Sequence, residues 1–260
     1  MNNKLKKLQI LKVKDKNEIH YKPKDVISDI PLRLLVVGKS QLSGKTNFLV
    51  NILCRKEFYL DDFEGENIYI ISGSIGNDNK LTKLIDCKEI DPQNLFKTYD
   101  EELMEALYEM IEEDYETRIN NNMKPQEFLI CFDDMSASGI FKNATFGIIN
   151  KMFSVGRHIH LSTVITAQKF TDIGVNQREN MTMGVFFNCS DKQLDLITED
   201  INYATDKKTF KKKFRETTKE KHSFFIVSFT NNFENMYLDK NFEPINMGDD
   251  KINPITKNEK

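Results

Sequence analysis

A segment that ends in Gly44-Lys45-Thr46 follows an apolar run at residues 32–37. Between a buried strand and a helix, this ending is typical of a phosphate-binding loop. Backbone N–H groups at the start of the helix make such a loop an anion cradle. In it, Gly44 lets the backbone approach the phosphates, Lys45 pairs with the β- and γ-phosphates, and the Thr46 hydroxyl binds Mg²⁺. The sequence therefore predicts a site for ATP with Mg²⁺.

The spacing of this loop departs from the usual one. The standard motif places its first glycine at position 39, but Lys39 stands there and Gly38 lies one residue earlier. Either the loop carries an extra residue or Lys39 fills the first position. Gly38, Ser40 and Ser43 complete the predicted ATP-binding residues.

Two carboxylates, Asp133 and Asp134, follow the apolar run at residues 128–132. Ligands of parallel sheets bind at the carboxyl ends of the strands. A hydrolytic site needs one acid to hold Mg²⁺, here Asp133, and another to position the attacking water, here Asp134. A strand that ends in a solvated turn is the alternative interpretation. Gln168 ends another apolar run and is a candidate sensor of the γ-phosphate.

The elements that position these residues alternate along the chain. Apolar runs predict strands at residues 32–37, 67–72, 127–132, 160–167 and 183–187. Helices are expected at 46–58, after an Asp100 cap, at 145–155, and after Ser190, which has capping-box spacing. The apolar stripe of the long helix after Asp100 is expected to comprise Leu103, Met104, Leu107, Met110 and Ile111. This order predicts an α/β fold with a mostly parallel sheet, in which the strand that ends at Gln168 lies between the two motif strands.

Three regions flank this core. Residues 1–30 form a Lys-rich N-terminal extension in which residues 8–13 are a candidate edge strand. The ATPase domain is expected at 31–246, with a C-terminal β-hairpin at 222–240, because apolar segments at 223–229 and 234–238 flank a turn. Residues 247–260 are a polar tail.

Composition narrows the class of protein without naming an activity. The chain has 260 residues, 39% of them hydrophobic, and a net charge of −3. This charge does not indicate a nucleic-acid binder. Four cysteines stand far apart in the sequence, which favours free thiols in a reducing compartment. No apolar run reaches the ~20 residues of a membrane helix, so we expect a chain without membrane insertion.

These motifs together resemble the genome-packaging ATPases of poxviruses, giant viruses and virophages, within the FtsK–HerA superfamily. The resemblance covers residues 32–187, and its segments are VVGKSQLSGKT, FLICFDDM, GRHIHLSTVITAQ and the Arg-Glu-Asn at 178–180. It implies a RecA-like P-loop fold, a homo-oligomeric ring, and ATP-driven packaging of double-stranded DNA with capsid components as partners. It also implies a location in the host cytoplasm or viral factory, or in association with the virion.

The resemblance further implies an arginine that reaches a neighbouring subunit's nucleotide. That role maps onto Arg157, and Arg178 is the competing candidate.

Lys211, Lys212 and Lys213 belong to the one dense basic run. Such clusters bind DNA without regard to sequence, through counterion release, but a solvated helix face is the alternative.

The rival functions are another translocase or helicase of the same superfamily and a small nucleoside or nucleotide kinase. A structural protein without turnover is the third, and the Asp133-Asp134 pair argues against it.

Overall fold

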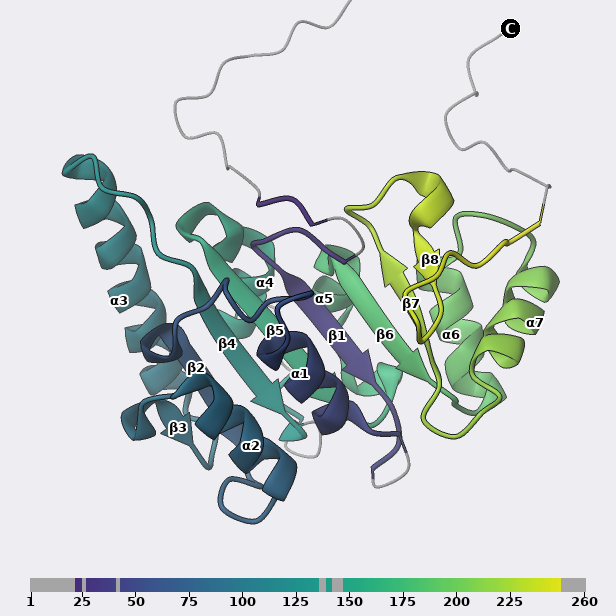
Figure 1. Cartoon of the computed structure of the whole chain (residues 1–260), viewed down its shortest axis with the longest axis horizontal. Coiled ribbons are helices and arrows are strands. Elements are labelled where there is room, and N and C mark those ends of the chain that lie inside the picture. Colours follow the sequence, from purple (N-terminus) through teal and green to yellow (C-terminus); the bar gives the residue numbers. More distant parts are fainter. Residues whose placement is uncertain (1–21, 25–26, 41–42, 136–138, 142–146, 249–260) are drawn as a thin grey trace, which may run out of the picture.

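The apolar runs of the sequence form the centre of a single sheet. The computed structural model describes residues 22–24, 27–40, 43–135, 139–141 and 147–248. Within these residues eight strands are arranged in the order β3-β2-β4-β5-β1-β6-β7-β8 (Figure 1). Their bounds are Arg33–Val37 (β1), Ile68–Ser72 (β2), Leu95–Phe96 (β3), Phe128–Asp133 (β4), Leu161–Ala167 (β5), Met183–Phe187 (β6), Phe224–Ser228 (β7) and Tyr237–Leu238 (β8).

The strands from β3 to β6 pair in parallel, whereas β7 and β8 are antiparallel. The predicted α/β fold with a mostly parallel sheet and a C-terminal hairpin is therefore confirmed. Strand β5 lies between β1 and β4, as expected for the strand that ends at Gln168. Every residue of β1, β2, β4, β5 and β6 is buried, because helices cover both faces of the sheet.

Two layers of helices enclose the sheet. Helices α1 and α2 pack on one face and lie in front of the sheet in Figure 1, whereas α3, α4, α6 and α7 pack on the other. The helices are Lys45–Cys54 (α1), Asn79–Lys88 (α2), Glu101–Asn120 (α3), Ile148–Val155 (α4), Val175–Asn180 (α5), Asp191–Ile201 (α6) and Lys207–Thr217 (α7).

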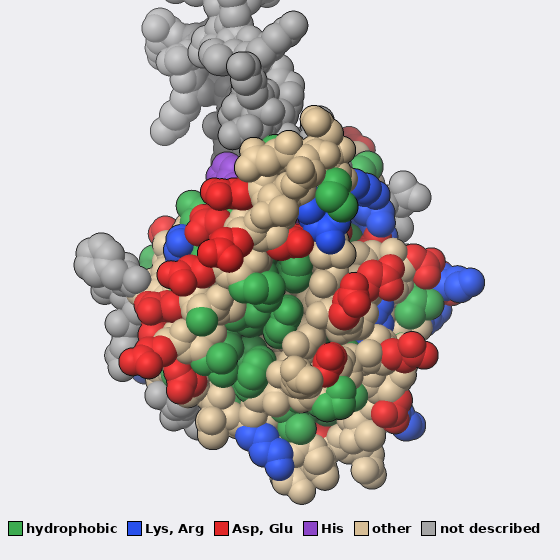
Figure 2. Space-filling view, turned by 90° about the vertical axis from the view of Figure 1, so that its left-hand side faces the viewer, with side chains coloured by type: hydrophobic (Ala, Val, Ile, Leu, Met, Phe, Trp, Pro, Cys, Tyr) green, Lys and Arg blue, Asp and Glu red, His purple; other side chains and the backbone are tan. Residues whose placement is uncertain are grey.

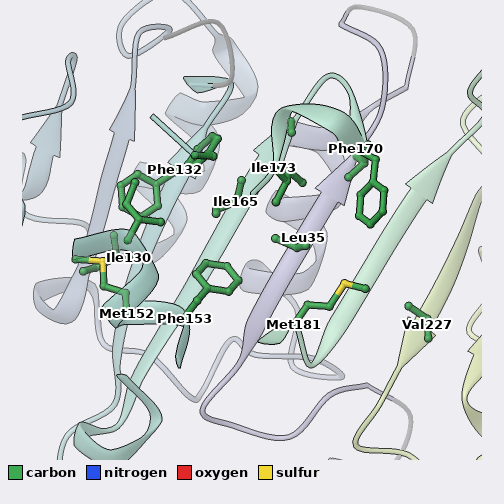
Figure 3. Packing of buried hydrophobic residues seen from close by; sticks show 14 of the residues in the cluster. Leu35, Ile130, Phe132, Met152, Phe153, Ile165, Phe170, Ile173, Met181 and Val227 are labelled. Carbon is green, nitrogen blue, oxygen red and sulfur yellow. The ribbon is translucent and has the colours of Figure 1, made fainter. Parts of the chain in front are cut away.

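On the face of the sheet opposite α1, strand residues pack against helix α4. Figure 3 shows Leu35, Ile130 and Ile165 of three neighbouring strands facing Met152 and Phe153 of α4. All five side chains are fully buried. Their burial fixes the relative positions of β1, β4 and β5, whose carboxyl ends carry the predicted site residues.

Two helices differ from their predicted form. Helix α1 ends at Cys54 rather than near residue 58, because Arg55 adopts an extended conformation with φ −121° and ψ 139°. In α3 the Asp100 cap is confirmed: its side chain accepts a hydrogen bond from the Leu103 N–H over 3.1 Å. The predicted stripe was wrong at two positions, because Leu103 and Met110 are about 40% exposed and Tyr108 is buried in their place.

Other boundaries also moved. Ser190 precedes α6, but its side chain makes no capping hydrogen bond, so the capping box was wrong. Helix α4 begins at Ile148, and residues 142–146 of the predicted helix, like the candidate strand at 8–13, lie outside the described residues. Strand β8 begins at Tyr237 because a 3₁₀ turn, Phe233–Asn235, takes up the start of the predicted strand.

The packing of α1 against α2 brings two cysteines together that are 33 positions apart in the sequence, Cys54 and Cys87. Burial has the largest effect on the Cys54 thiol and a hydrogen bond with Cys87 the next, and they raise its pKa to about 12. The thiolate is the reactive form, so Cys54 is an unreactive thiol.

Candidate functional site

Three parallel neighbours, β1, β5 and β4, end at the same edge of the sheet, and the predicted site residues follow them. Gly38, after β1, donates its N–H to the Ala167 carbonyl oxygen of β5 over 3.0 Å. The Gln168 side chain, after β5, donates to Asp134 Oδ1, after β4, over 3.1 Å. The structure therefore brings the loop, the acidic pair and the candidate sensor together.

Gly38 is a position where the backbone has no room for a side chain. A Cβ atom there would lie 2.6 Å from Ser43 Cβ and 2.9 Å from Phe187 Cβ. The Ser43 hydroxyl closes the loop by donating to the Lys39 carbonyl oxygen over 2.7 Å. The Lys39 side chain is exposed, so Gly38 is the residue that the close packing requires. This favours a loop with an extra residue over one that starts at Lys39, although Gln41 and Leu42 lie outside the described residues.

A Gly38→Ala variant is expected to lose about 1 to 3 kcal/mol of unfolding free energy, the usual cost of overpacking. Its ATP affinity should fall as well, because displaced Ser43 precedes Gly44 directly. Thermal denaturation with and without MgATP measures both effects. Gly73→Ala is the matched control, since its added Cβ would meet only the Lys97 carbonyl oxygen at 3.8 Å. Equal melting and binding in the two variants would show that the approach at Gly38 is not needed.

Lys45 reaches the centre of the site from the first residue of α1. Gly44 precedes it with φ 95°, a left-handed conformation that glycine adopts without strain. The Lys45 ammonium donates to the Gly38 carbonyl oxygen over 2.8 Å and has other donors to offer a phosphate. Burial lowers the pKa of Lys45, whereas the neighbouring charges of Asp134 and Asp133 raise it.

The remaining loop residues differ in their surroundings. Ser40 is exposed, whereas Thr46 is half-buried in the first turn of α1. His222, which the sequence analysis did not single out, lies against the loop with Nδ1 3.3 Å from the Ser43 carbonyl oxygen. It is separated from Ser43 by 179 positions, so no local pattern indicated the contact.

Asp133 is only 2% exposed and is held from two sides. Thr166 of β5 donates to Asp133 Oδ1 over 2.8 Å, and Ser72 of β2 donates to Asp133 Oδ2 over 3.3 Å. Burial raises the pKa of Asp133, while these hydrogen bonds and Lys45 lower it. Each hydroxyl lies near the carboxyl end of a strand next to β4, so its position in the sequence could have indicated this contact.

Asp134 differs from Asp133 in being exposed and in having φ 54°. Its N–H donates to the Thr166 hydroxyl over 2.9 Å, so one threonine holds both the Asp133 carboxylate and the Asp134 backbone. Asp and Asn tolerate this left-handed conformation better than most residues. The turn points the Asp134 carboxylate away from the sheet, where it contacts Gln168 and is accessible to water.

Of the two candidate arginines, Arg157 lies away from this edge and Arg178 is engaged by side chains of its own subunit. Arg157 precedes β5, so the length of the strand, roughly 20 Å, separates it from Gln168. Arg178 forms an ion pair with Asp200 and lies over the ring of Phe170, 5.2 Å from its centroid. Its side chain is 12% exposed, so Arg178 is held within its own subunit. These contacts favour Arg157 for any role at a neighbouring subunit.

The basic run forms α7 and packs through Phe210 and Phe214. Lys211 pairs with Asp195 of α6, and Lys212 lies 4.0 Å from Glu216. These acids offset part of the charge, and a DNA contact by Lys211, Lys212 and Lys213 stays a prediction.

The end of the sheet opposite α7, where α3 lies, is negatively charged. Figure 2 shows carboxylates around an apolar area on the side of the molecule where α3 lies. Leu103 and Met110 of α3 are exposed there. The eight acids of α3 are Glu101, Glu102, Glu105, Glu109, Glu112, Glu113, Asp114 and Glu116. Because DNA phosphates are repelled by such a face, DNA contact is expected elsewhere.

The residues of the site fit Mg²⁺ in the manner of nucleotide sites. Among the described residues no three His, Cys, Asp or Glu side chains are grouped to hold a metal. Mg²⁺ is usually bound through one or two carboxylates together with substrate phosphates and water. The buried Asp133 carboxylate and the Thr46 hydroxyl are hard oxygen donors of that kind, so the donor set suits this cation. In the part of the chain that the structure describes, no helix is long and apolar enough to cross a membrane.

Comparisons with known proteins agree with this geometry. Residues 18–238 match the sequence profile of the Poxvirus A32 protein family. No curated protein matches the chain in sequence. The genome packaging NTPase B204 of Sulfolobus turreted icosahedral virus 2, in complex with AMPPCP, is similar with a TM-score of 0.52 and 15% identity. The alignment covers 84% of this chain and 98% of that one.

The DNA-packaging ATPase B204 of Sulfolobus turreted icosahedral virus is similar with a TM-score of 0.50 and 12% identity, over 82% of this chain and 97% of that one. At these identities the likeness concerns the fold, and it confirms the predicted P-loop ATPase architecture.

Proposed function

The chain belongs to the Poxvirus A32 protein family, and from this and its site we propose that it is an ATPase that packages double-stranded DNA into a viral capsid. The observation that carries the proposal is the meeting of Lys45, the Asp133-Asp134 pair and Gln168 at one sheet edge. The solved packaging NTPases of similar fold, one of them in complex with an ATP analogue, support it.

Each residue has a distinct task in the proposed reaction. Lys45 and the N–H groups of the loop bind the phosphates and offset the charge that develops on the transferred group. Thr46 and Asp133 would hold Mg²⁺, which supplies further charge neutralisation. Asp134 orients the attacking water, and Gln168, hydrogen-bonded to it, places that carboxylate according to the presence of the γ-phosphate.

An Asp134→Asn variant is expected to bind ATP normally and to hydrolyse it ~10² to 10⁴ times more slowly, the usual contribution of a positioned acid–base group. Asn tolerates the left-handed backbone at this position, so the fold should be unchanged. Single-turnover hydrolysis measures the chemical step. Asp172→Asn, on a 3₁₀ turn after β5, is a control that leaves the acidic pair intact. Normal hydrolysis by Asp134→Asn would remove this residue from the role.

The proposal predicts that double-stranded DNA stimulates ATP turnover. The test compares steady-state ATPase rates with and without a long DNA duplex at several salt concentrations, because phosphate contacts weaken as salt rises. Stimulation by nucleosides and not by DNA would instead indicate a small kinase. A DNA-filled capsid assembled without this protein would indicate a translocase or helicase with another task.

We further propose that the protein acts as a homo-oligomeric ring with capsid components as partners, in the host cytoplasm or viral factory. The position of Arg157, about a strand's length from its own loop, supports a site completed by a second subunit. Mass measurement in the presence of a non-hydrolysable ATP analogue tests the ring.

A further inference from the structure

A hollow of about 670 Å³ lies between α1 and the segments that enter and leave the C-terminal hairpin. It begins at Ser43 and Gly44 of the phosphate loop and continues along α1 past Asn47 and Asn51. Its size lies within the range of small-molecule sites, about 300 to 1,000 Å³. The hollow is therefore continuous with the phosphate cradle and large enough for a ligand.

We propose that this hollow holds the purine base and ribose of the nucleotide, with Phe224 and Phe242 as its aromatic wall. The inference rests on the proposed ATPase function and names the residues that select the nucleoside. N–H groups in the first turn of α1 cradle the α- and β-phosphates, so the nucleoside must continue from that turn. Asn47, which follows Thr46 directly, lines this hollow.

The wall of the hollow suits an aromatic base. Phe224 packs edge-on against Phe48 at 5.2 Å and Phe187 at 5.4 Å between ring centroids, which fixes its ring. Phe242 lies beside it, with its centroid 6.5 Å from that of Phe224 and 4.8 Å from that of Phe58. Both side chains are half-buried and line the hollow, so part of each is open to a ligand. Sites for small molecules combine such apolar walls with a few polar groups.

Asn51 supplies a polar group to the lining of the hollow. Its Nδ2 donates to the backbone carbonyl oxygen of Asn47 over 2.7 Å. The side-chain oxygen Oδ1 of Asn51 can then act as an acceptor. The exocyclic amino group of adenine is a donor, whereas guanine has a carbonyl at the same position. Asn51 can therefore accept a hydrogen bond from the amino group of adenine.

Backbone conformation gives an independent sign of function. His222 and Phe242 both line the hollow and both have positive φ, at 65° and 63°. Non-glycine residues in this conformation are held against a cost and concentrate at ligand sites. Another hollow beside the loop, of about 450 Å³, is lined by Gly38, Gln168 and polar side chains, which suits the γ-phosphate side and not a base.

The test compares MgATP with inorganic tripolyphosphate, which has the phosphates and no nucleoside. Phe242→Ala is expected to weaken ATP binding roughly 5- to 150-fold, the contribution of one base–aromatic contact, and to leave tripolyphosphate binding unchanged. The KM for ATP should rise by the same factor with kcat unchanged. Phe233→Ala, at an exposed phenylalanine of the hairpin outside the hollow, is the matched control and should change neither.

A second variant keeps the bulk of the side chain. The chain contains no Trp, so Phe242→Trp places a single reporter in the hollow, and its fluorescence should respond to ATP and not to tripolyphosphate. Unchanged ATP affinity in Phe242→Ala, or an equal response of the tryptophan to both ligands, would overturn the base site and leave the phosphate loop intact. If the wild-type chain binds neither ligand, the proposed ATPase function fails with it.

Discussion

A Lys45→Ala variant is expected to lose ATP binding and turnover almost completely. The side chain is 7% exposed, and its charge interacts with Asp134 and Asp133. Its removal leaves two carboxylates beside the phosphates with one cation fewer to compensate their charge. Removing one partner of a hydrogen-bonded charge pair from a binding site costs about 2 to 5 kcal/mol, which corresponds to a Kd for ATP at least ~30-fold higher. Calorimetric titration with MgATP and a steady-state ATPase assay measure the two losses.

The effect should be confined to the site. Burial already disfavours the charged ammonium, so the alanine variant is expected to fold, and a thermal melt without nucleotide checks this. Lys56→Ala, which removes an exposed cation just beyond the other end of α1, is the control and should bind ATP like the wild type. Turnover near the wild-type rate in Lys45→Ala would contradict the assignment of the phosphate loop.

The central strands could be predicted from the sequence because they are buried on both faces. A strand such as β6 then has only apolar residues and glycine, and a continuous run in the sequence defines it. Strand β3 could not be predicted, because its two half-buried residues pair with β2 alone. Helix α7 was expected only as the alternative to a DNA contact and without bounds, since only Phe210 and Phe214 mark its buried side within a run of charged residues.

The site followed the same logic. Lys45, Asp134 and Gln168 were predicted together because the carboxyl ends of neighbouring parallel strands must meet. His222 was not found, because its position against Ser43 depends on how the strand β7 returns to the sheet edge. The ion pair between Arg178 and Asp200 likewise depends on how α5 lies relative to α6. The spacing of residues in the sequence does not indicate that arrangement.

Arg157 is the residue that we propose an assembled ring would place at another subunit's nucleotide. It lies in the 3₁₀ turn Gly156–Ile159, at the amino end of β5, whereas its own loop lies at the carboxyl end of the sheet. A direct contact with the nucleotide of its own subunit would need a guanidinium to span roughly 20 Å, the length of the strand. Any contact of Arg157 with ATP must therefore come from a second copy of the chain.

An Arg157→Ala variant is expected to bind ATP through its intact loop and to hydrolyse it ~10³ to 10⁵ times more slowly, as for arginine fingers of related systems. Mixed with Lys45→Ala subunits, which keep Arg157, it should regain part of the activity, because some interfaces then pair an intact loop with an intact arginine. ATPase assays across mixing ratios, with mixed oligomers verified by native mass spectrometry, measure the rescue.

Arg178→Ala is expected to behave differently: loss of its pair with Asp200 should lower the melting temperature, and mixing should not rescue it. If confirmed mixed oligomers of Arg157→Ala show no rescue at any ratio, Arg157 does not act across the interface. A lower melting temperature with unchanged turnover per folded subunit would instead give it a structural role beneath β5.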